Sequence, residues 1–97
     1  MENIKYIEEW YKSKCDGNWE HNYGIKIYTL DNPGWAVKID LMDTDLEEID
    51  FESVKKEYSN KSWIDCKIKD NIFIGYGGVD NLNEILSIFY NKILLNK

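Results

Sequence analysis

The stretch that decides the fold runs from Tyr23 to Leu41 and reads Y-G-I-K-I-Y-T-L-D-N-P-G-W-A-V-K-I-D-L. Apolar residues occupy alternate positions on both sides of Pro33-Gly34, which is typical of two half-buried strands joined by a turn. The two apolar sets share one face of an antiparallel pair only if the connecting loop has an odd number of residues. We therefore expect strands over residues 23–30 and 35–42. The odd loop should centre on Pro33-Gly34, with a positive φ at Gly34.

A second hairpin is predicted over residues 63–68 and 72–76. Each of its strands has one apolar face, made of Ile64, Cys66 and Ile68 in the first and of Ile72, Ile74 and Tyr76 in the second. The two faces coincide if Lys69-Asp70-Asn71 is a three-residue loop with Asn71 in the left-handed conformation. Residues 43–61 show no clear period, and we expect a loop there, followed by a strand near residues 54–59.

Residues 3–15 and 80–95 are predicted helices because their apolar residues recur at helical spacing. Asn3 and either Asp80 or Asn81 are the expected N-caps, and Asp16-Gly17 should end the first helix with the glycine left-handed. We therefore expect an α+β fold in which residues 1–97 form a single domain. One antiparallel meander of four or five strands should carry both terminal helices on one face. The expected core comprises Trp10, Ile25, Ile27, Val37, Ile39, Ile64, Cys66, Ile68 and Phe89.

The chain is acidic, with 18 Asp and Glu residues against 12 lysines, no arginine and a net charge of −6. This balance argues against direct nucleic-acid binding and against an anionic membrane surface, since both need a basic face. It favours a cationic partner, or it simply keeps the chain soluble. No run of residues is apolar enough to cross a membrane. We expect no secretory leader, because residues 1–4 begin an amphipathic helix, and two distant cysteines suit a reduced cytoplasm.

Two surface segments are candidates for binding a partner. The first is a lysine-free run from Asp40 to Glu52, in which seven of the thirteen residues are acids. It is either a solvated loop or a negative surface for a basic partner. The second is the loop at residues 15–21, which holds more aromatic and charged residues than a plain linker needs. Trp19 and Trp63 are the tryptophans expected to be exposed. The candidate binding residues are Asp43, Asp45, Glu47, Glu48, Asp50, Trp19, Glu20 and His21.

Metal and catalytic sites find little support in the sequence. Cys15, Asp16, Glu20 and His21 are possible metal ligands, but their spacing matches no standard zinc pattern and the chain has one histidine. We expect no metal and no cofactor. His21 beside a carboxylate could act in general acid–base catalysis, but the chain has no nucleophile motif and no glycine-rich phosphate loop to support such a site. Sulfur transfer needs a cysteine thiolate, which is disfavoured for Cys15 at a helix C-terminus and for Cys66 on a core face.

The order W-Y…C-D-G-x-W-E-H-x-Y-G-I-x-I-x-T-L-D-N-P-G-W-x-V-x-I-D, from Trp10 to Asp40, resembles the immunity protein 53 family of bacterial polymorphic toxin systems. Weaker similarity extends to residues 63–66 and to the last helix. The resemblance implies a non-enzymatic protein that binds and neutralises a cognate toxin, by covering its active site or a neighbouring site. A basic nuclease would suit the charge.

An enzyme is the alternative, since similar chains are sometimes labelled rhodanese-related sulfurtransferases. Such an enzyme would use Cys15 or Cys66. A rhodanese domain is a parallel α/β fold, however, and this chain lacks the alternation of strands and helices that such a fold needs. The sequence does not indicate the oligomeric state or the chemistry of the toxin.

Overall fold

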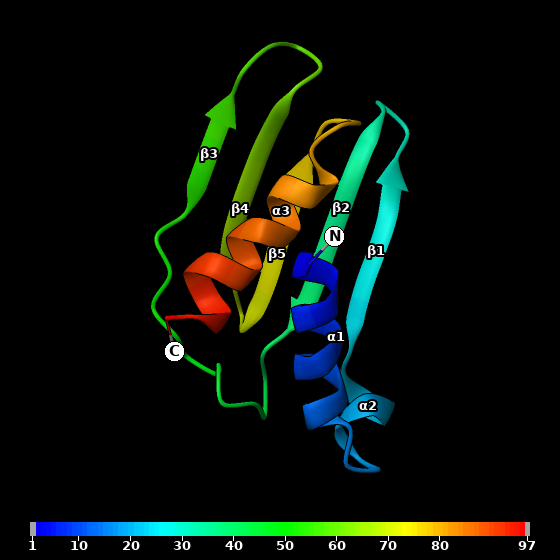
Figure 1. Ribbon diagram of the computed structural model, residues 1–97, viewed down its shortest axis with the longest axis vertical. Helices are drawn as coiled ribbons and strands as arrows, with labels where there is room; N and C mark the ends of the chain where they lie inside the picture. The colour runs from blue at the N-terminus through cyan, green and yellow to red at the C-terminus, as the bar shows by residue number, and fades with distance from the viewer. Residues whose placement is uncertain (1, 97) are drawn as a thin grey trace.

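The computed structural model describes residues 2–96, so Met1 and Lys97, the two ends of the predicted domain, lie outside the described residues. Within that range five strands form one antiparallel sheet in the order β1-β2-β5-β4-β3 (Figure 1). The strands are β1 (Ile25–Leu30), β2 (Gly34–Asp40), β3 (Val54–Glu57), β4 (Trp63–Lys69) and β5 (Ile72–Gly77). The predicted α+β class with a single antiparallel sheet is confirmed.

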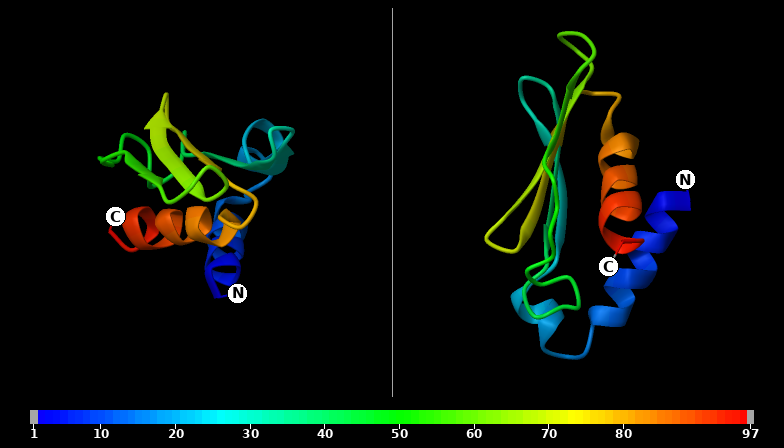
Figure 2. Two further views of the ribbon diagram at one scale, coloured as in Figure 1. Left: turned by 90° about the horizontal axis from the view of Figure 1, so that it is seen from above. Right: turned by 90° about the vertical axis from the view of Figure 1, so that its left-hand side faces the viewer.

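The helices are α1 (Glu2–Lys14), the short α2 (Trp19–Asn22) and α3 (Leu82–Ile88), which continues as the π-helical segment η1 (Phe89–Leu94). Figure 2 shows α1 and α3 on the same side of the sheet, as predicted, while no described helix covers the opposite side, here called the bare face. No helix within residues 2–96 has the length and apolar character needed to span a membrane.

The two predicted helix caps behave differently. Asn3 lies inside α1, and its Nδ2 donates to Oδ1 of Asn83 at 3.2 Å, so its prediction as a cap is wrong. Asn81 does precede α3, but its buried side chain makes no capping hydrogen bond. Its Oδ1 instead accepts from the backbone N–H of Trp63 at 3.3 Å. Asn81 therefore fastens the start of α3 to β4.

The order of the strands differs from a simple meander, because β2 lies beside β5 and not beside β3. The chain forms a β1–β2 hairpin and a β3–β4–β5 meander, and the two units meet at the β2–β5 pair. The connection from residue 41 to residue 53 runs along one end of the sheet from its middle to its far edge (Figure 1). The predicted strand after this connection is confirmed as β3.

The loop between β1 and β2 contains three residues, Asp31–Pro33, because Leu30 pairs with Gly34. The predicted odd number of loop residues is confirmed, but the loop is not centred on Pro33-Gly34, because Gly34 already belongs to β2. Ile25 pairs with Ile39 and Ile27 with Val37, so the two predicted apolar sets share one face, on the helix side. Gly34 does not have the predicted positive φ. A glycine is needed there for another reason, since an added Cβ would meet the carbonyl oxygen of Gly77 in the neighbouring strand.

The turn between β4 and β5 contains two residues, Asp70 and Asn71, with φ of 53° and 59°. Asn71 is left-handed as predicted, but the three-residue loop is wrong because Lys69 pairs with Ile72. Moving the register by one residue turns β5 over. The residues of β5 on the helix side are therefore Phe73, Gly75 and Gly77, while Ile72, Ile74 and Tyr76 lie on the bare face.

The core lies between the sheet and the helices. Its fully buried members include Val37, Ile39, Leu41, Leu46, Ile64, Cys66, Phe73, Ile85, Leu86, Phe89 and Ile93. Most of the predicted core is confirmed. Ile25 and Ile68 are partly buried, and Ile27 is 46% exposed although it points to the helix side. Ile27 stays exposed because β1 is an edge strand that the helices cover incompletely.

Helix α3 approaches the sheet most closely at Gly75, where an added Cβ would collide with Cγ2 of Ile85. We expect Gly75→Ala to lower the free energy of unfolding by about 1–3 kcal/mol, because an overpacked core forces the backbone to shift. Urea denaturation measures this. Gly24→Ala is the matched control, since none of the described atoms lies within 4 Å of a Cβ there. A Gly75→Ala protein as stable as the control would show that α3 can move away without loss.

Candidate functional site

The acid run lies in the connection between β2 and β3, here called the acidic loop (residues 41–53). It is folded into tight turns around the fully buried Leu46. The hydroxyl of Thr44 accepts from the N–H of Leu46 at 3.0 Å and donates to the carbonyl of Leu41 at 2.7 Å. All five acids predicted to bind a partner are exposed, namely Asp43, Asp45, Glu47, Glu48 and Asp50.

Two neighbouring elements hold the acidic loop in place. Nζ of Lys14, at the end of α1, lies 2.7 Å from Oδ1 of Asp45. The side chain of Asn71, in the β4–β5 turn, accepts from the N–H of Glu48 and donates to its Oε1, both at 2.7 Å. The acids of the loop therefore project from a backbone that is tied to α1 and to the β4–β5 turn.

The segment between α1 and α2 is closed by two carboxylates. Oδ1 of Asp16 accepts from the N–H groups of Asn18 and Trp19, both at 2.9 Å. The carboxylate of Glu20 accepts from the N–H groups of Asp16 and Gly17 at 2.9 and 2.8 Å. Gly17 has a φ of 91°, so the predicted left-handed glycine after the first helix is confirmed. We call this arrangement the carboxylate clamp.

Hydrogen bonds to backbone N–H groups favour the charged form of both clamp residues. The N–H of Trp19, followed by that of Asn18, holds the pKa of Asp16 below its ordinary value of 3.8. The N–H of Glu20 itself, together with those of Gly17 and Asp16, holds the pKa of Glu20 below 4.5. The clamp is therefore negatively charged and closed at neutral pH.

Trp19 is buried, with 4% of its surface exposed, so the prediction that it is an exposed aromatic is wrong. Its Nε1 donates to the carbonyl of Met42 at 3.0 Å, and its ring packs edge-on against Trp10 at 6.0 Å. Trp63, the other tryptophan expected at the surface, is half-buried. Trp19 thus supports the binding candidates around it and does not present its own ring to a partner.

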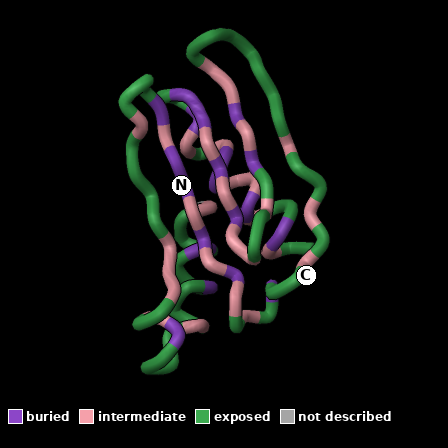
Figure 3. Tube along the Cα trace, turned by 180° about the vertical axis from the view of Figure 1, so that it is seen from behind, coloured by how far each residue is buried: buried purple, intermediate pink, exposed green. Residues whose placement is uncertain are grey.

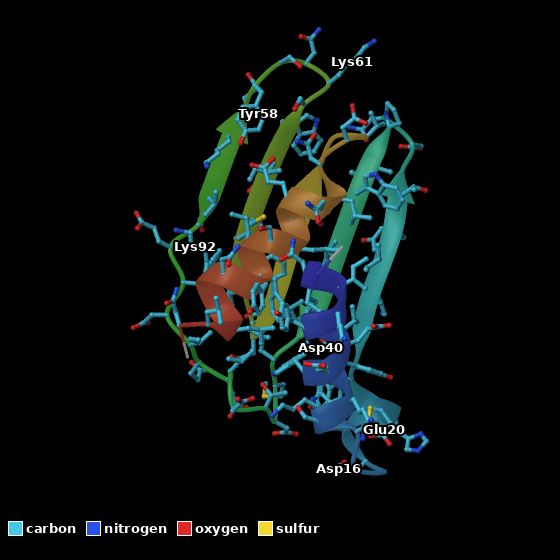
Figure 4. All side chains as sticks on the ribbon, in the orientation of Figure 1. Asp16, Glu20, Asp40, Tyr58, Lys61 and Lys92 are labelled. Atoms are coloured by element: carbon cyan, nitrogen blue, oxygen red, sulfur yellow. The ribbon has the colours of Figure 1, made fainter. Side chains whose placement is uncertain are left out.

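The two candidate segments lie side by side at one end of the molecule. The Lys14–Asp45 ion pair and the Trp19–Met42 hydrogen bond join the α1–α2 region directly to the acidic loop. Figure 4 shows Asp16 and Glu20 at this end, at the bottom of the view. We call this surface the acidic end, made of the exposed Asp43, Asp45, Glu47, Glu48, Asp50 and His21 together with the half-buried Glu20.

The residues that hold the acidic loop in place are not predicted by the sequence. Lys14 lies in the last turn of α1, where a lysine is common and does not indicate a particular partner. Asn71 is predicted only as a turn residue, although its side chain also contacts Glu48. The sequence gives no local signal for either contact, since each depends on where distant elements meet.

A groove of about 600 Å³ opens beside the acidic end, between α1 and β1. Its walls are mostly apolar and include Ile4, Ile7, Tyr11, Ile25 and Ile27. His21 also lines it, so the groove and the acidic end share this residue. The sequence does not predict the groove, because its alternation places Ile27 in the core and not at an open surface.

The chain matches the protein family described as immunity protein 53 over residues 4–93. It belongs to the immunity protein 53 family. The match includes all five strands and both long helices except the outermost residues. An immunity role follows from this membership, with a toxin as partner in general. No curated protein and no solved structure matches the chain.

The cysteines of this immunity protein do not resemble a sulfurtransferase site. Burial raises the pKa of Cys66 to about 12, so its thiolate is scarce at neutral pH. Cys15 is exposed, and its Sγ donates to the carbonyl of Tyr11 at 3.3 Å at the end of α1. Residues 2–96 contain no group of three His, Cys, Asp or Glu side chains placed to hold a metal ion.

The carboxylate clamp should make part of the stability depend on pH. Groups whose pKa is lowered by folding stabilise the fold above their unfolded pKa values, here 3.8 and 4.5, and lose this effect as the pH falls through the folded values. We therefore expect the stability difference between the wild type and Glu20→Gln to be largest near neutral pH and to shrink below about pH 4. Urea denaturation at both pH values measures it. Glu52→Gln, at an exposed position, is the control and should show a constant difference; a constant difference for Glu20→Gln as well would argue against the clamp.

Replacing both cysteines tests the enzyme alternative. We expect Cys15→Ser to leave protection against the toxin unchanged. Cys66→Ser should lower the free energy of unfolding by about 1–2 kcal/mol, because the serine hydroxyl is buried without a hydrogen-bond partner. Thermal unfolding and a thiosulfate:cyanide sulfurtransferase assay are the measurements. Sulfur transfer by the wild type that Cys15→Ser abolishes in a folded protein would establish the enzyme.

Proposed function

We propose that this immunity protein binds a cognate bacterial toxin and neutralises it by covering the active site with the acidic end. One observation carries the proposal. Two segments that are separate in the sequence form a continuous surface whose carboxylates project from a braced backbone. A preorganised surface loses little entropy when it binds, so more of the interaction energy appears as affinity.

The charge of the acidic end favours a basic partner. A nuclease that binds the phosphates of its substrate needs a basic active site. Carboxylates at fixed positions would occupy that site in place of the phosphates and exclude the substrate. Opposite charges also accelerate encounter, which matters for an immunity protein that must reach the toxin before the toxin reaches its substrate. We place this encounter in the cytoplasm.

Charge reversal tests which end of the protein meets the toxin. Glu47→Lys with Asp50→Lys changes two exposed acids of the acidic end without removing the Lys14 or Asn71 contacts. The probe is a toxin domain expressed from a gene that neighbours this one. We expect the double variant to bind it with an on-rate reduced about tenfold or more. Added salt should slow the wild type and affect the variant less, since exposed charges are screened over about 8–10 Å. Surface plasmon resonance measures both rates.

The matched control is Asp31→Lys with Asp80→Lys, which makes the same change in net charge. Asp31 lies in the β1–β2 turn and Asp80 just before α3, at the opposite end of the sheet from the acidic loop (Figure 1). If net charge alone steers the toxin, both double variants slow association equally and the acidic end is not the interface. If the wild type forms no complex with the neighbouring toxin domain, the proposed function itself fails.

A further inference from the structure

The two edges of the sheet differ in how well they are protected against pairing with another strand. Edge strand β3 is four residues long, and three of them are charged, Lys55, Lys56 and Glu57. Short, charged edges are the usual protection against strand addition. Edge strand β1 has six residues and one charge, Lys26, and it exposes 46% of Ile27 and 41% of Tyr28. Strand β1 is therefore the unprotected edge.

The register shows which backbone groups of β1 point outward. The N–H of Asp40 donates to the carbonyl of Gly24 at 3.1 Å, so these residues form a hydrogen-bonded pair. Hydrogen-bonded and non-hydrogen-bonded pairs alternate along an antiparallel ladder. Lys26 and Tyr28 therefore bond to β2, whereas the N–H and C=O groups of Ile27 and Thr29 point away from it. An added strand would find these groups available.

The side chain of Ile27, at one of these outward-facing positions, points to the helix side, into the groove between α1 and β1. Ile27 lines this groove of about 600 Å³, opposite Ile4, which is 39% exposed, and Tyr11, which is 38% exposed. Glu8 stands on the same face of α1, one turn from Ile4. A strand paired with β1 would point alternate side chains into this groove. Apolar side chains would contact its apolar walls, and one cation would pair with Glu8.

We propose that an extended segment of the toxin adds to β1 as a sixth strand and places apolar side chains in the groove. This inference rests on the proposed function and names the manner of binding. Backbone pairing would supply affinity, and the groove would select the alternate side chains. The groove is continuous with the acidic end through His21, so a toxin held at that end has its segment beside β1.

Charge complementarity favours a toxin segment over a second copy of this chain. Two copies would bring together molecules of net charge −6 that repel each other. A β1–β1 pair would also place only the uncharged Ile25, Ile27 and Thr29 on the groove side, and it would bring no cation toward Glu8. A basic toxin segment instead brings cations toward Glu8 and the acidic end, and it can carry larger apolar side chains.

Hydrogen exchange of single amides is the direct test. In the free protein, the N–H groups of Ile27 and Thr29 should exchange rapidly, and those of Lys26 and Tyr28 slowly. Bound to the inactivated toxin domain encoded beside the gene, Ile27 and Thr29 should slow at least tenfold. The outward N–H of Lys55 on β3 should not change. A complex in which Ile27 and Thr29 exchange as in the free protein overturns strand addition and leaves the proposed function standing.

Proline substitution gives a second test. Ile27→Pro removes an outward N–H and blocks pairing while keeping the bonds to β2, so dissociation should become at least tenfold faster. Lys55→Pro is the matched control, because Lys55 also points outward: the neighbouring N–H of Tyr58 donates to Ser62, which fixes the alternation. Circular dichroism checks folding, and Ile27→Lys, which keeps the N–H but fills the groove with a charge, is the substitute if Ile27→Pro unfolds.

Three further results would overturn the inference. Equal dissociation rates for the wild type, Ile27→Pro and Ile27→Lys would exclude β1 from the interface. Protection of Ile27 and Thr29 in the free protein, together with a dimer in light scattering, would assign the edge to a second copy of the chain. Failure of the wild type to bind the toxin domain at all would remove the proposed function and this inference with it.

Discussion

The rest of the structure depends on the close approach of α3 to β5 over Gly75 and Gly77. An added Cβ at either glycine would run into the side chain of Ile85, so only glycine lets the helix lie this near to the sheet. A small chain buries little surface, and one helix drawn onto the middle of the sheet is an efficient way to close its core. The same placement leaves β1, at the edge, to α1 alone. The exposed Ile27 and the groove beside it follow from where α3 must lie.

The individual helices and strands were predictable because the pattern that indicates each of them lies within a short stretch of sequence. Periodicity located both long helices and the strands, and parity required an odd number of residues in the loop between β1 and β2. The β4–β5 turn was not predictable in the same way, since Ile72, Ile74 and Tyr76 look like a core face. The true core face consists of the residues that alternate with these, namely Phe73, Gly75 and Gly77. The glycines carry no apolar signal, although their role is to admit Ile85. The pairing of β2 with β5 also escaped prediction, because hairpin patterns do not say how hairpins meet.

The candidate site was predicted in composition but not in arrangement. The five acids are exposed, as a lysine-free run suggests, and the second segment lies against them. Trp19 was misassigned because a tryptophan among polar residues looks like a surface anchor. In fact the carboxylate clamp turns the chain so that the Trp19 ring enters the core and its Nε1 reaches Met42. The polar neighbours of Trp19 in the sequence are therefore poor evidence that its ring is exposed, because they stabilise the turn.

In the proposed mode of binding, the acidic end and the open edge have separate tasks. The bare face of the sheet faces the viewer in Figure 3. On this face the strand registers place Lys26, Lys38 and Lys67 in one cross-strand row with Ile74. Lys26 and Lys38 lie directly opposite each other, which costs some stability. The exposed acids of the acidic loop gather negative charge at one end of the sheet, where Lys14 offsets part of it by pairing with Asp45. Such a field orients a basic partner during encounter but adds modestly to affinity. A long-lived complex needs contacts that water does not weaken, and paired backbone groups beside an apolar groove provide them. An edge left open next to a steering surface carries little risk of unwanted pairing, since molecules of this charge repel each other until a cationic strand arrives.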